Sequence, residues 1–486
     1  MADPQYLDLA ARRLFAIESR RELPDIINFS DVKASWRRYR DEMLRHLHNP
    51  HCGPDRVELI EHPKDPLSVR PLARFGVKDR LTYESLIFQV SSIVDSKISD
   101  NVFSYRARRT SIHSVQDWLD MRHHAREVLN ADESLIMART DVTAFYEHVA
   151  LDILSMDLSR AGVSDALLNK VLYFLQRFQE QSRAWGLPQG SSASGVLANV
   201  YLAPVDEVIR QSAVRHVRYS DDMYLFGDDR EHLRSSLLTA NQALRGRRLS
   251  MSATKTHIYG RDKALDHLDD AEKDLVSYFY YLGSEWAKKT LADLFLEASQ
   301  KGNERDIKFS LTRFGKKRDE IALTWALENV KNLHHLSDQI LRYAERFPRH
   351  SENLRQCIER VIIENNLADY PYLERNLLHA ALRARIESGI IKDHAWQVLK
   401  NQNRSNYPRE FAARYIGRYA SMPDGPILKM QYESEESEPV QRALIISLYE
   451  ADYIPPQLLT NLSRSGSELR WTAAYLLRSP DVPLPS

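Results

Sequence analysis

Cysteine is nearly absent from this chain of 486 residues, which contains only Cys52 and Cys357. Two cysteines cannot build a disulfide framework or a four-cysteine zinc site, so we expect a reducing, cytoplasmic environment. Cys52 lies near His46, His48 and His51 in the sequence, but a zinc site there would lack a second cysteine pair. We therefore do not predict zinc binding.

An excess of charge of one sign and long apolar runs are also missing. The chain has 67 basic and 67 acidic residues, for a formal net charge of +0. This balance argues mildly against a nucleic-acid-binding protein, yet it is compatible with a local basic channel. No apolar run approaches the ~20 residues of a membrane helix, and the first residues lack a signal-peptide pattern. We therefore expect no association with membranes.

The order of apolar patterns predicts an α+β region followed by helices. Residues 1–60 have helical spacing, and Asp31 is predicted to cap a helix. Residues 135–138 and the two flanks of Asp221 have strand patterns, whereas 166–178 and 194–210 have helical ones. This alternation indicates helices packed on a small antiparallel sheet.

After about residue 287 only helical patterns remain. Phe411, Val440 and Leu469 recur at equal intervals, and each is followed four and eight residues later by a hydrophobic position. Stacked helical hairpins similar to HEAT repeats would give this spacing, and one irregular helical bundle is the alternative.

Three acidic residues occur where a cleft could hold them. Asp141 follows the apolar strand pattern, while Asp221 and Asp222 fall at the tip of a predicted hairpin. Taken singly, Asp141 suits a helix N-cap and the Asp pair suits a turn. Together they suit two-metal phosphoryl transfer, which needs carboxylates from separate strands, and a divalent cation would offset their repulsion.

A glycine-rich turn precedes the helix predicted at 194–210. Gly190 permits close approach of a ligand to the backbone, and small residues follow it up to Gly195. A base pair could lie flat against such a surface. A simple loop with an N-cap is the structural alternative.

These segments resemble, in order, the blocks of reverse transcriptases. DVTAFY resembles the first palm block, GLPQG followed by NVYL the second, and YSDD the YxDD box. LSMSATKTHIYG and YLG resemble the two blocks that follow. Upstream, RPLARFGVKDR and FSYRARRTS resemble fingers blocks of intron and retron enzymes. The resemblance covers about residues 65–290.

The resemblance implies a role for each matching residue. Asp141 and Asp221 would be essential ligands of Mg²⁺ or Mn²⁺, with Asp222 and the backbone of Val142 supporting them. The nucleotide-binding residues would be Arg70, Tyr146, Gln189, Gly190 and Lys255. Arg70 would contact the triphosphate of the nucleotide, and Lys255 would lie near its phosphates. Tyr146 would be a steric gate that selects dNTPs over rNTPs.

Several motifs depart from the family pattern. SYR lacks the GF of the SYGFR form, and SASG replaces the usual SP after the glutamine turn. No zinc-type cysteine pairs, H-N-H nuclease signature or RNase H acidic set follow. A polymerase with a long helical extension resembles the prokaryotic abortive-infection and related defence reverse transcriptases. That resemblance implies anti-phage defence, homo-oligomers, a DNA product and, in some members, protein-primed synthesis without a template.

The predicted organisation is a right-hand polymerase. Residues 1–64 form an N-terminal helical region, 65–140 the fingers, and 141–287 the palm, with part of the fingers inserted at 157–185. A helical thumb and HEAT-like region occupies 288–486. The alternatives are a conventional reverse transcriptase that copies an associated RNA, a viral-type RNA polymerase, and a helical scaffold with a relic palm.

Overall fold

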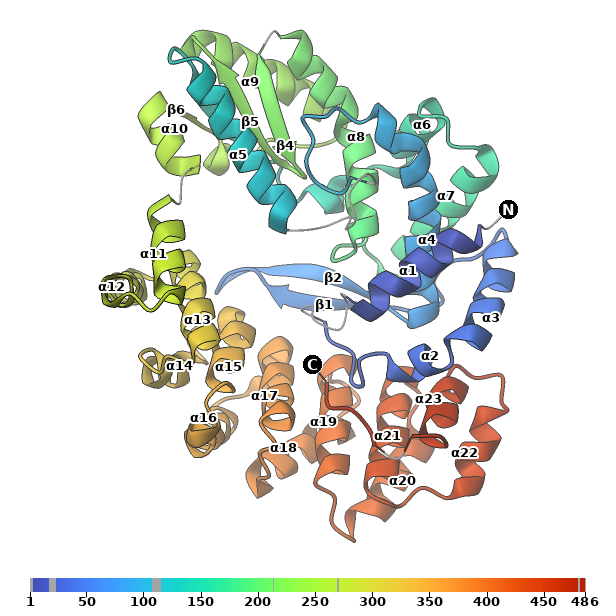
Figure 1. Cartoon of the computed structure of the whole chain (residues 1–486). Coiled ribbons are helices and arrows are strands. Elements are labelled where there is room, and N and C mark those ends of the chain that lie inside the picture. The colour runs from blue at the N-terminus through green and yellow to red at the C-terminus, as the bar shows by residue number, and fades with distance from the viewer. Residues whose placement is uncertain are drawn as a thin grey trace. The chain divides into compact units, whose positions relative to one another are not determined.

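The computed structural model describes residues 3–16, 23–106, 115–212, 214–268, 271–479 and 481–485. It divides the chain into two compact units (Figure 1). The first contains Met1–Arg12, Asp41–Leu59 and Leu72–Glu272, and the second contains Arg13–Arg40, Ile60–Pro71 and Lys273–Ser486. The predicted domain boundaries stay a prediction.

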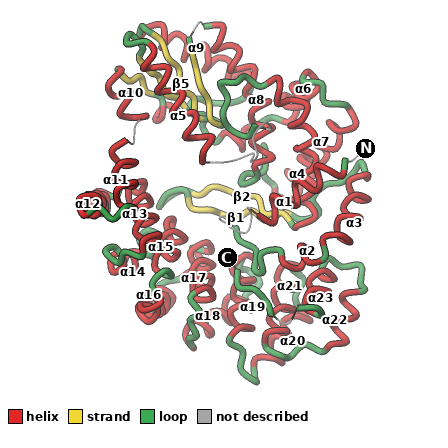
Figure 2. The backbone as a smooth tube through the Cα atoms, in the orientation of Figure 1, coloured by secondary structure: helices red, strands yellow, loops and turns green. Residues whose placement is uncertain are grey.

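A four-stranded antiparallel sheet forms the centre of the first unit, and Figure 2 shows its strands in yellow. The strand order is β4 (Arg215–Tyr219), β5 (Asp222–Gly227), β3 (Ile136–Thr140) and β6 (His257–Tyr259). Thr140 pairs with Met223, and Tyr219 pairs with Asp222 across a two-residue turn. The end of β3 and the β4–β5 turn therefore lie at the same edge of the sheet.

Helices cover both faces of this sheet, as its strand pattern requires. Every residue of β5 after Asp222 is buried, which is typical of a strand covered on both faces. On one face α5 and α10 pack against Met137, Tyr224 and Phe226, while α8 and α9 contact β4 and β5. The α+β fold predicted from the sequence, with helices packed on a small antiparallel sheet, is confirmed.

The remaining elements up to residue 268 are mostly helical. The strands β1 (Val57–Pro63) and β2 (Val69–Phe75) form a separate two-stranded sheet. The helices are α1 (Pro4–Ala16), α2 (Ser30–Ala34), α3 (Trp36–His48), α4 (Val77–Val94), α5 (Val115–Ala131), α6 (Leu151–Arg160), α7 (Asp165–Ser182), α8 (Ser192–Gln211), α9 (Arg230–Gly246) and α10 (Arg261–Leu268).

The described part of the second unit beyond residue 271 is helical. Its helices are α11 (Ala271–Tyr281), α12 (Glu285–Lys301), α13 (Glu304–Lys317), α14 (Leu323–Asn329), α15 (Ser337–Ala344), α16 (Ser351–Glu364), α17 (Pro371–Arg383), α18 (Gly389–Lys400), α19 (Asn406–Arg418), α20 (Asp424–Ser434), α21 (Glu438–Glu450), α22 (Pro456–Ser463) and α23 (Leu469–Leu476). No helix among the described residues is both long and apolar enough to cross a bilayer.

Alternate helices of this unit pack in series. α13, α15, α17, α19, α21 and α23 each contact the next member of the series, and α18, α20 and α22 each pack against the helix that follows. Phe411, Val440 and Leu469 fall on α19, α21 and α23, and all three are buried. The recurring positions thus lie on successive helices of one layer. Naming these helices HEAT-like stays a proposal.

The N-terminal segment belongs to the same unit. α2 packs against α23, and the Tyr39 and Trp471 rings lie 4.9 Å apart. Arg442 donates to both Asp25 and Asp31, which are buried. The prediction that Asp31 caps a helix is wrong, because it lies inside α2 and its carboxylate accepts from Arg442 instead.

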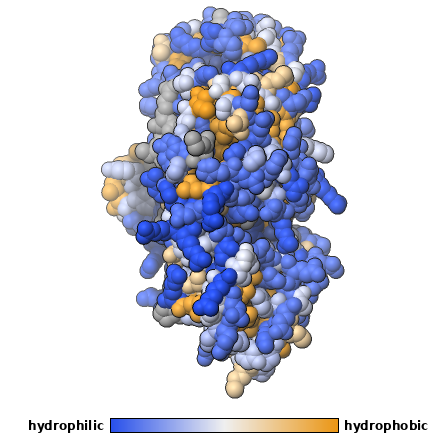
Figure 3. Space-filling view, turned by 90° about the vertical axis from the view of Figure 1, so that its right-hand side faces the viewer, coloured by the Kyte–Doolittle hydropathy of each residue, from blue (hydrophilic) through white to orange (hydrophobic). Residues whose placement is uncertain are grey.

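The surface is mostly polar on the face that Figure 3 turns to the viewer. Apolar atoms form small separate patches among the described residues of that face.

Candidate active site

Asp141 and Asp221 meet at the edge of the first unit's sheet. Asp141 follows β3 directly and is buried, and its backbone carbonyl accepts from the Ser252 amide at 2.8 Å. Asp221 lies in the β4–β5 turn next to Ser220, whose φ of 57° is rare for a residue with a side chain. The predicted hairpin tip is therefore present, and its backbone is strained.

The two carboxylates repel each other. Burial, the Asp141 carboxylate and the Asp222 carboxylate raise the pKa of Asp221 to about 6, while Lys255 acts in the opposite direction. The Nζ atom of Lys255 contacts the Oδ2 atom of Asp141 at 2.7 Å. The Lys255 ammonium thus partly compensates the negative charge of the two carboxylates. A metal cation bound between them would compensate this charge further.

Asp222 is directed to a different partner. Its Oδ1 atom accepts from Nη2 of Arg139 at 3.0 Å, and Arg139 lies on β3. Among the residues that the structure describes, no group of three or more His, Cys, Asp or Glu side chains is arranged to hold a metal. The structure brings together two of the three predicted carboxylates, and the supporting role of Asp222 stays a prediction.

Val142 forms an isolated antiparallel bridge with Met251. Thr143 donates to Ser250, and Ser252 donates to Asp141, so these bonds flank the Val142–Met251 bridge. In such an antiparallel pair the carbonyl of the central residue points away from its partner. The Val142 carbonyl is therefore directed away from Met251, and its role as a ligand stays a prediction.

A buried polar network binds the backbone of the β4–β5 turn that carries Asp221. Arg218, at 0% exposure, donates to Asp206 at 2.6 Å, to Asn199 and to the Ser220 carbonyl. The Ser220 amide donates to Ser104 Oγ at 2.8 Å. Because a buried guanidinium needs partners for its donors, this network fixes the position of the turn. Sequence reasoning missed Arg218, although a charged residue inside an apolar strand pattern was a signal.

The glutamine turn packs against β2. Gln189 accepts from the Ala73 amide at 3.0 Å, and its side chain donates to Glu147 at 3.1 Å. Gly190 has a φ of 89°, which glycine adopts without strain. The residues 191–195 that follow are buried, so the flat open surface expected there is not exposed.

Tyr146 lies beside the carboxylate turn. Its hydroxyl is 3.1 Å from Ser220 Oγ. Burial, together with Tyr105 and the Asp221 carboxylate, raises the pKa of Tyr146 well above its ordinary value. The tyrosine therefore remains protonated and can serve as a rigid, neutral wall.

Arg70 is an exposed residue of β2 in the stretch that belongs to the second unit, so its contact with a triphosphate stays a prediction. The end of the predicted block FSYRARRTS lies outside the described residues.

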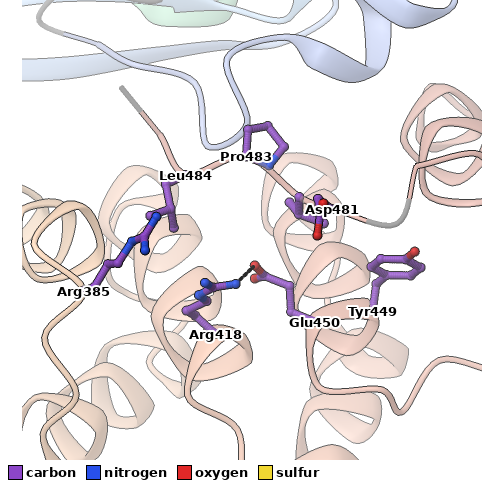
Figure 4. Close-up of a pocket in the computed structure, with 8 residues that line it drawn as sticks. Arg385, Arg418, Tyr449, Glu450, Asp481, Pro483 and Leu484 are labelled. Carbon is purple, nitrogen blue, oxygen red and sulfur yellow. Dashed lines mark ion pairs between the residues drawn. The ribbon is translucent and has the colours of Figure 1, made fainter.

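A polar pocket of about 440 Å³ lies in the second unit (Figure 4). Its residues follow the segments that resemble reverse transcriptase blocks in the sequence. It is lined by Arg385, Arg418, Tyr449, Glu450 and residues 481–484. Arg414 and Arg418 both form ion pairs with Glu450, so the acid of this pocket already has cationic partners. None of the site residues predicted from the sequence lines it.

Comparisons with known proteins agree with the sequence blocks. The model of the family described as reverse transcriptase (RNA-dependent DNA polymerase) matches residues 62–285. Among solved structures, the chain is similar to telomerase from Candida albicans in complex with a fragment of telomeric RNA, with 16% identity and a TM-score of 0.34. That match covers 64% of this chain and 61% of the telomerase chain. No curated protein matches. Residues 62–285 thus form a reverse transcriptase domain, which is an RNA-directed DNA polymerase domain.

Proposed function

We propose that this protein is a DNA polymerase of the reverse transcriptase type that adds dNTPs by phosphoryl transfer at Asp141 and Asp221. The observation that carries the proposal is the convergence of these two carboxylates, from β3 and from the β4–β5 turn, with Lys255 beside them. Phosphoryl transfer depends mostly on positioning and on charge compensation, and rigid strand ends supply the first.

The donor set fits Mg²⁺, with Mn²⁺ as the alternative ion. Reverse transcriptases use divalent metal ions. Carboxylate and carbonyl oxygens are the ligands that Mg²⁺ prefers, and Asp141, Asp221 and the Val142 carbonyl would provide them. The raised pKa of Asp221 supports this fit, because burial and the nearby Asp141 carboxylate both disfavour its charged form, and a bound cation would offset both effects. Bound metal would lower the pKa of an attacking hydroxyl and stabilise the departing pyrophosphate.

The surrounding residues would bind and orient the nucleotide. Lys255 would move from Asp141 to the phosphates once a metal neutralises the carboxylates. Gln189 and Gly190 would line the nucleotide pocket, and Arg70 would contact the triphosphate. Tyr146 would close the space beside the sugar and so favour dNTPs over rNTPs.

The biological role that we propose is anti-phage defence by abortive infection. The supporting observation is the long helical region after the polymerase domain, in a chain without zinc-type cysteine pairs. In this role the enzyme would act in the cytoplasm as a homo-oligomer. It would extend a protein hydroxyl without a template, whereas a conventional enzyme would copy an associated RNA.

Purified protein should be incubated with Mg²⁺ and labelled dNTPs without added nucleic acid, and the product treated with protease and nuclease. We expect DNA that remains attached to protein. Synthesis only after RNA and a primer are added would contradict template independence and support the conventional enzyme.

The same assay tests the carboxylates. Asp221→Asn should abolish synthesis by removing a metal ligand, and Asp222→Asn should reduce it less. The matched control is Asp152→Asn, because Asp152 forms an exposed ion pair with Arg248 and should be dispensable. Normal synthesis by Asp221→Asn would refute the proposed function.

A further inference from the structure

Tyr105 has an unusual conformation for a tyrosine. Its φ is 53°, in the left-handed region that side chains rarely adopt. Such a conformation persists only where the surroundings enforce it, and it often marks a functional site. The surroundings of Tyr105 therefore hold its backbone in this conformation.

The ring of Tyr105 is seated directly on Gly195 of α8. A Cβ atom placed on Gly195 would lie 2.4 to 2.5 Å from three ring atoms of Tyr105, which is closer than real Cβ contacts come. No side chain larger than hydrogen fits between the helix and the ring. Gly195 is thus required by Tyr105.

The residues before Tyr105 are tied to the catalytic turn. Val102 bridges to Arg218 in parallel, and Ser104 accepts from the Ser220 amide at 2.8 Å. Asn199 donates to the Ser104 carbonyl at 2.7 Å, which links the same segment to α8. The backbone of Tyr105 therefore has a fixed place beside the turn that holds Asp221.

Tyr105 reaches Tyr146 from this position. The two tyrosines interact through their side chains, and the Tyr146 hydroxyl also contacts Ser220 Oγ. The Tyr105 ring lies 6.4 Å from the Tyr219 ring. The side chain of Tyr146 thus contacts both Tyr105 and the carboxylate turn.

Two departures from the family motifs meet at this contact. Tyr105 belongs to the SYR segment that lacks the usual GF, and Gly195 stands in the SASG segment that replaces SP. A Cβ atom at position 195 would clash with the Tyr105 ring, so a glycine in the SASG segment fits this contact. A proline or alanine at 195 would displace the Tyr105 ring.

We propose that Tyr105 is a positioning residue that, supported on Gly195, fixes Tyr146 beside Asp221 and so sets the selection of dNTPs over rNTPs. This inference rests on the proposed function, because it assigns Tyr105 a part in the same nucleotide site. Tyr105 acts through Tyr146 and needs no contact with the reacting atoms.

Nucleotide selection should be measured as binding of α,β-imido analogues of dATP and ATP in Mg²⁺, by isothermal titration calorimetry. Tyr105→Ala should lower the preference for the deoxy analogue about tenfold, since a misplaced wall discriminates poorly. Tyr105→Phe keeps the ring on Gly195 and should retain more of the preference. In turnover assays, Tyr105→Ala should lower the KM for rNTPs. The fold change in this KM should be larger than the fold change in kcat for dNTPs.

A double-mutant cycle tests the contact without any nucleotide. Gly195→Ala should lower the thermal unfolding midpoint in the wild-type background, because the new methyl group meets the ring. In the Tyr105→Ala background the methyl group has room, so Gly195→Ala should have little further effect. Additive losses would show that the ring does not rest on Gly195 and would overturn the inference.

The two experiments separate the inference from the proposed function. Wild-type protein that binds neither analogue would refute the proposed function. Selective wild-type binding that Tyr105→Ala and Gly195→Ala both leave unchanged would refute the inference alone.

Discussion

At the scale of single residues, the Asp141–Asp221 pair is held under electrostatic strain. Asp141 is buried and Asp221 is half-buried at a sheet edge, and the Lys255 ammonium is a direct cationic partner of Asp141. Such an arrangement costs folding free energy, which the protein retains because function needs the charges together. The strain has a measurable pH signature.

Asp221→Asn should stabilise the metal-free protein near neutral pH. The pKa of Asp221 is about 6 in the folded state, above that of an unfolded aspartate, so the folded state binds the extra proton. Wild-type stability therefore falls as pH rises from about 4 to about 6, and the variant lacks this loss. We expect a gain on the order of 2 kcal/mol near pH 7 and little gain near pH 4.

Urea unfolding in the presence of EDTA measures this difference. Added Mg²⁺ should stabilise the wild type near pH 7 and the variant much less, because the variant lacks one charged ligand. A gain of equal size at both pH values would contradict the charge explanation.

Contacts between residues distant in the sequence could be predicted only for residues that belong to a recognisable motif. Asp141 and Asp221 follow apolar strands, and the prediction that they act together came from the combination of the two motifs and from the resemblance to reverse transcriptases. The pairing of Asp222 with Arg139 depends on side-chain direction in the β3–β5 register, and the Tyr105–Gly195 contact joins a loop to a helix 90 residues away in sequence. Local spacing holds no information on either.

At the scale of elements, the second unit depends on close helix packing. Gly417 lies on α19, and a Cβ atom added there would be 2.4 Å from the Ser447 Cα atom of α21. Ser447 Oγ donates to the Ala413 carbonyl at 2.7 Å across the same interface. The two helices approach closely because position 417 has no side chain.

Gly417→Ala should destabilise the protein by about 1–3 kcal/mol, because the methyl group overpacks a backbone contact. Gly389→Ala is the matched control, since Gly389 starts α18 and has no atom within 4 Å of an added Cβ. The control should be neutral or slightly stabilising, because alanine favours helices. Thermal unfolding of the two variants measures the difference, and equal losses would refute the packing argument.

Periodicity identified several elements but not their ends. The predicted helices 166–178 and 194–210 correspond to α7 and α8, and the predicted strand 135–138 corresponds to β3, which continues to Thr140. α8 starts at Ser192 because Ser191 accepts from the Ala193 amide at 3.2 Å. The apolar pattern itself does not record such caps.

At the scale of the whole molecule, one arginine joins distant parts of the sequence. Arg442 on α21 binds Asp25 and Asp31, which are separated from it by 417 and 411 residues. Burial acts to raise the pKa of Asp25, but Arg442 and the backbone amides of Phe29 and Ile27 together lower this pKa below its ordinary value. Stability from this pairing is therefore present above the ordinary carboxyl pKa of about 4 and is lost as pH falls below it.

Arg442→Met should cost about 3–5 kcal/mol near pH 7, because it leaves two buried carboxylates without their cation. The cost should shrink near pH 3, where protonated carboxyls need no partner. Lys429→Met is the control, since Lys429 forms an exposed pair with Glu433 in the same unit. Urea unfolding followed by tryptophan fluorescence would report both, and a cost that does not depend on pH would contradict the ion-pair explanation.

The separation of Asp31 from Arg442 in the sequence also delays the formation of their ion pair during translation. The ribosome completes residues 13–40 early, yet their ion-pair partner follows 411 residues later. At about 5–20 residues per second, this delay is about 20–80 s, far longer than a helix takes to form. Residues 13–40 therefore remain without this ion-pair partner until α21 has been synthesised, when only α22 and α23 are still to follow. Chaperone contact during translation is most needed at this segment.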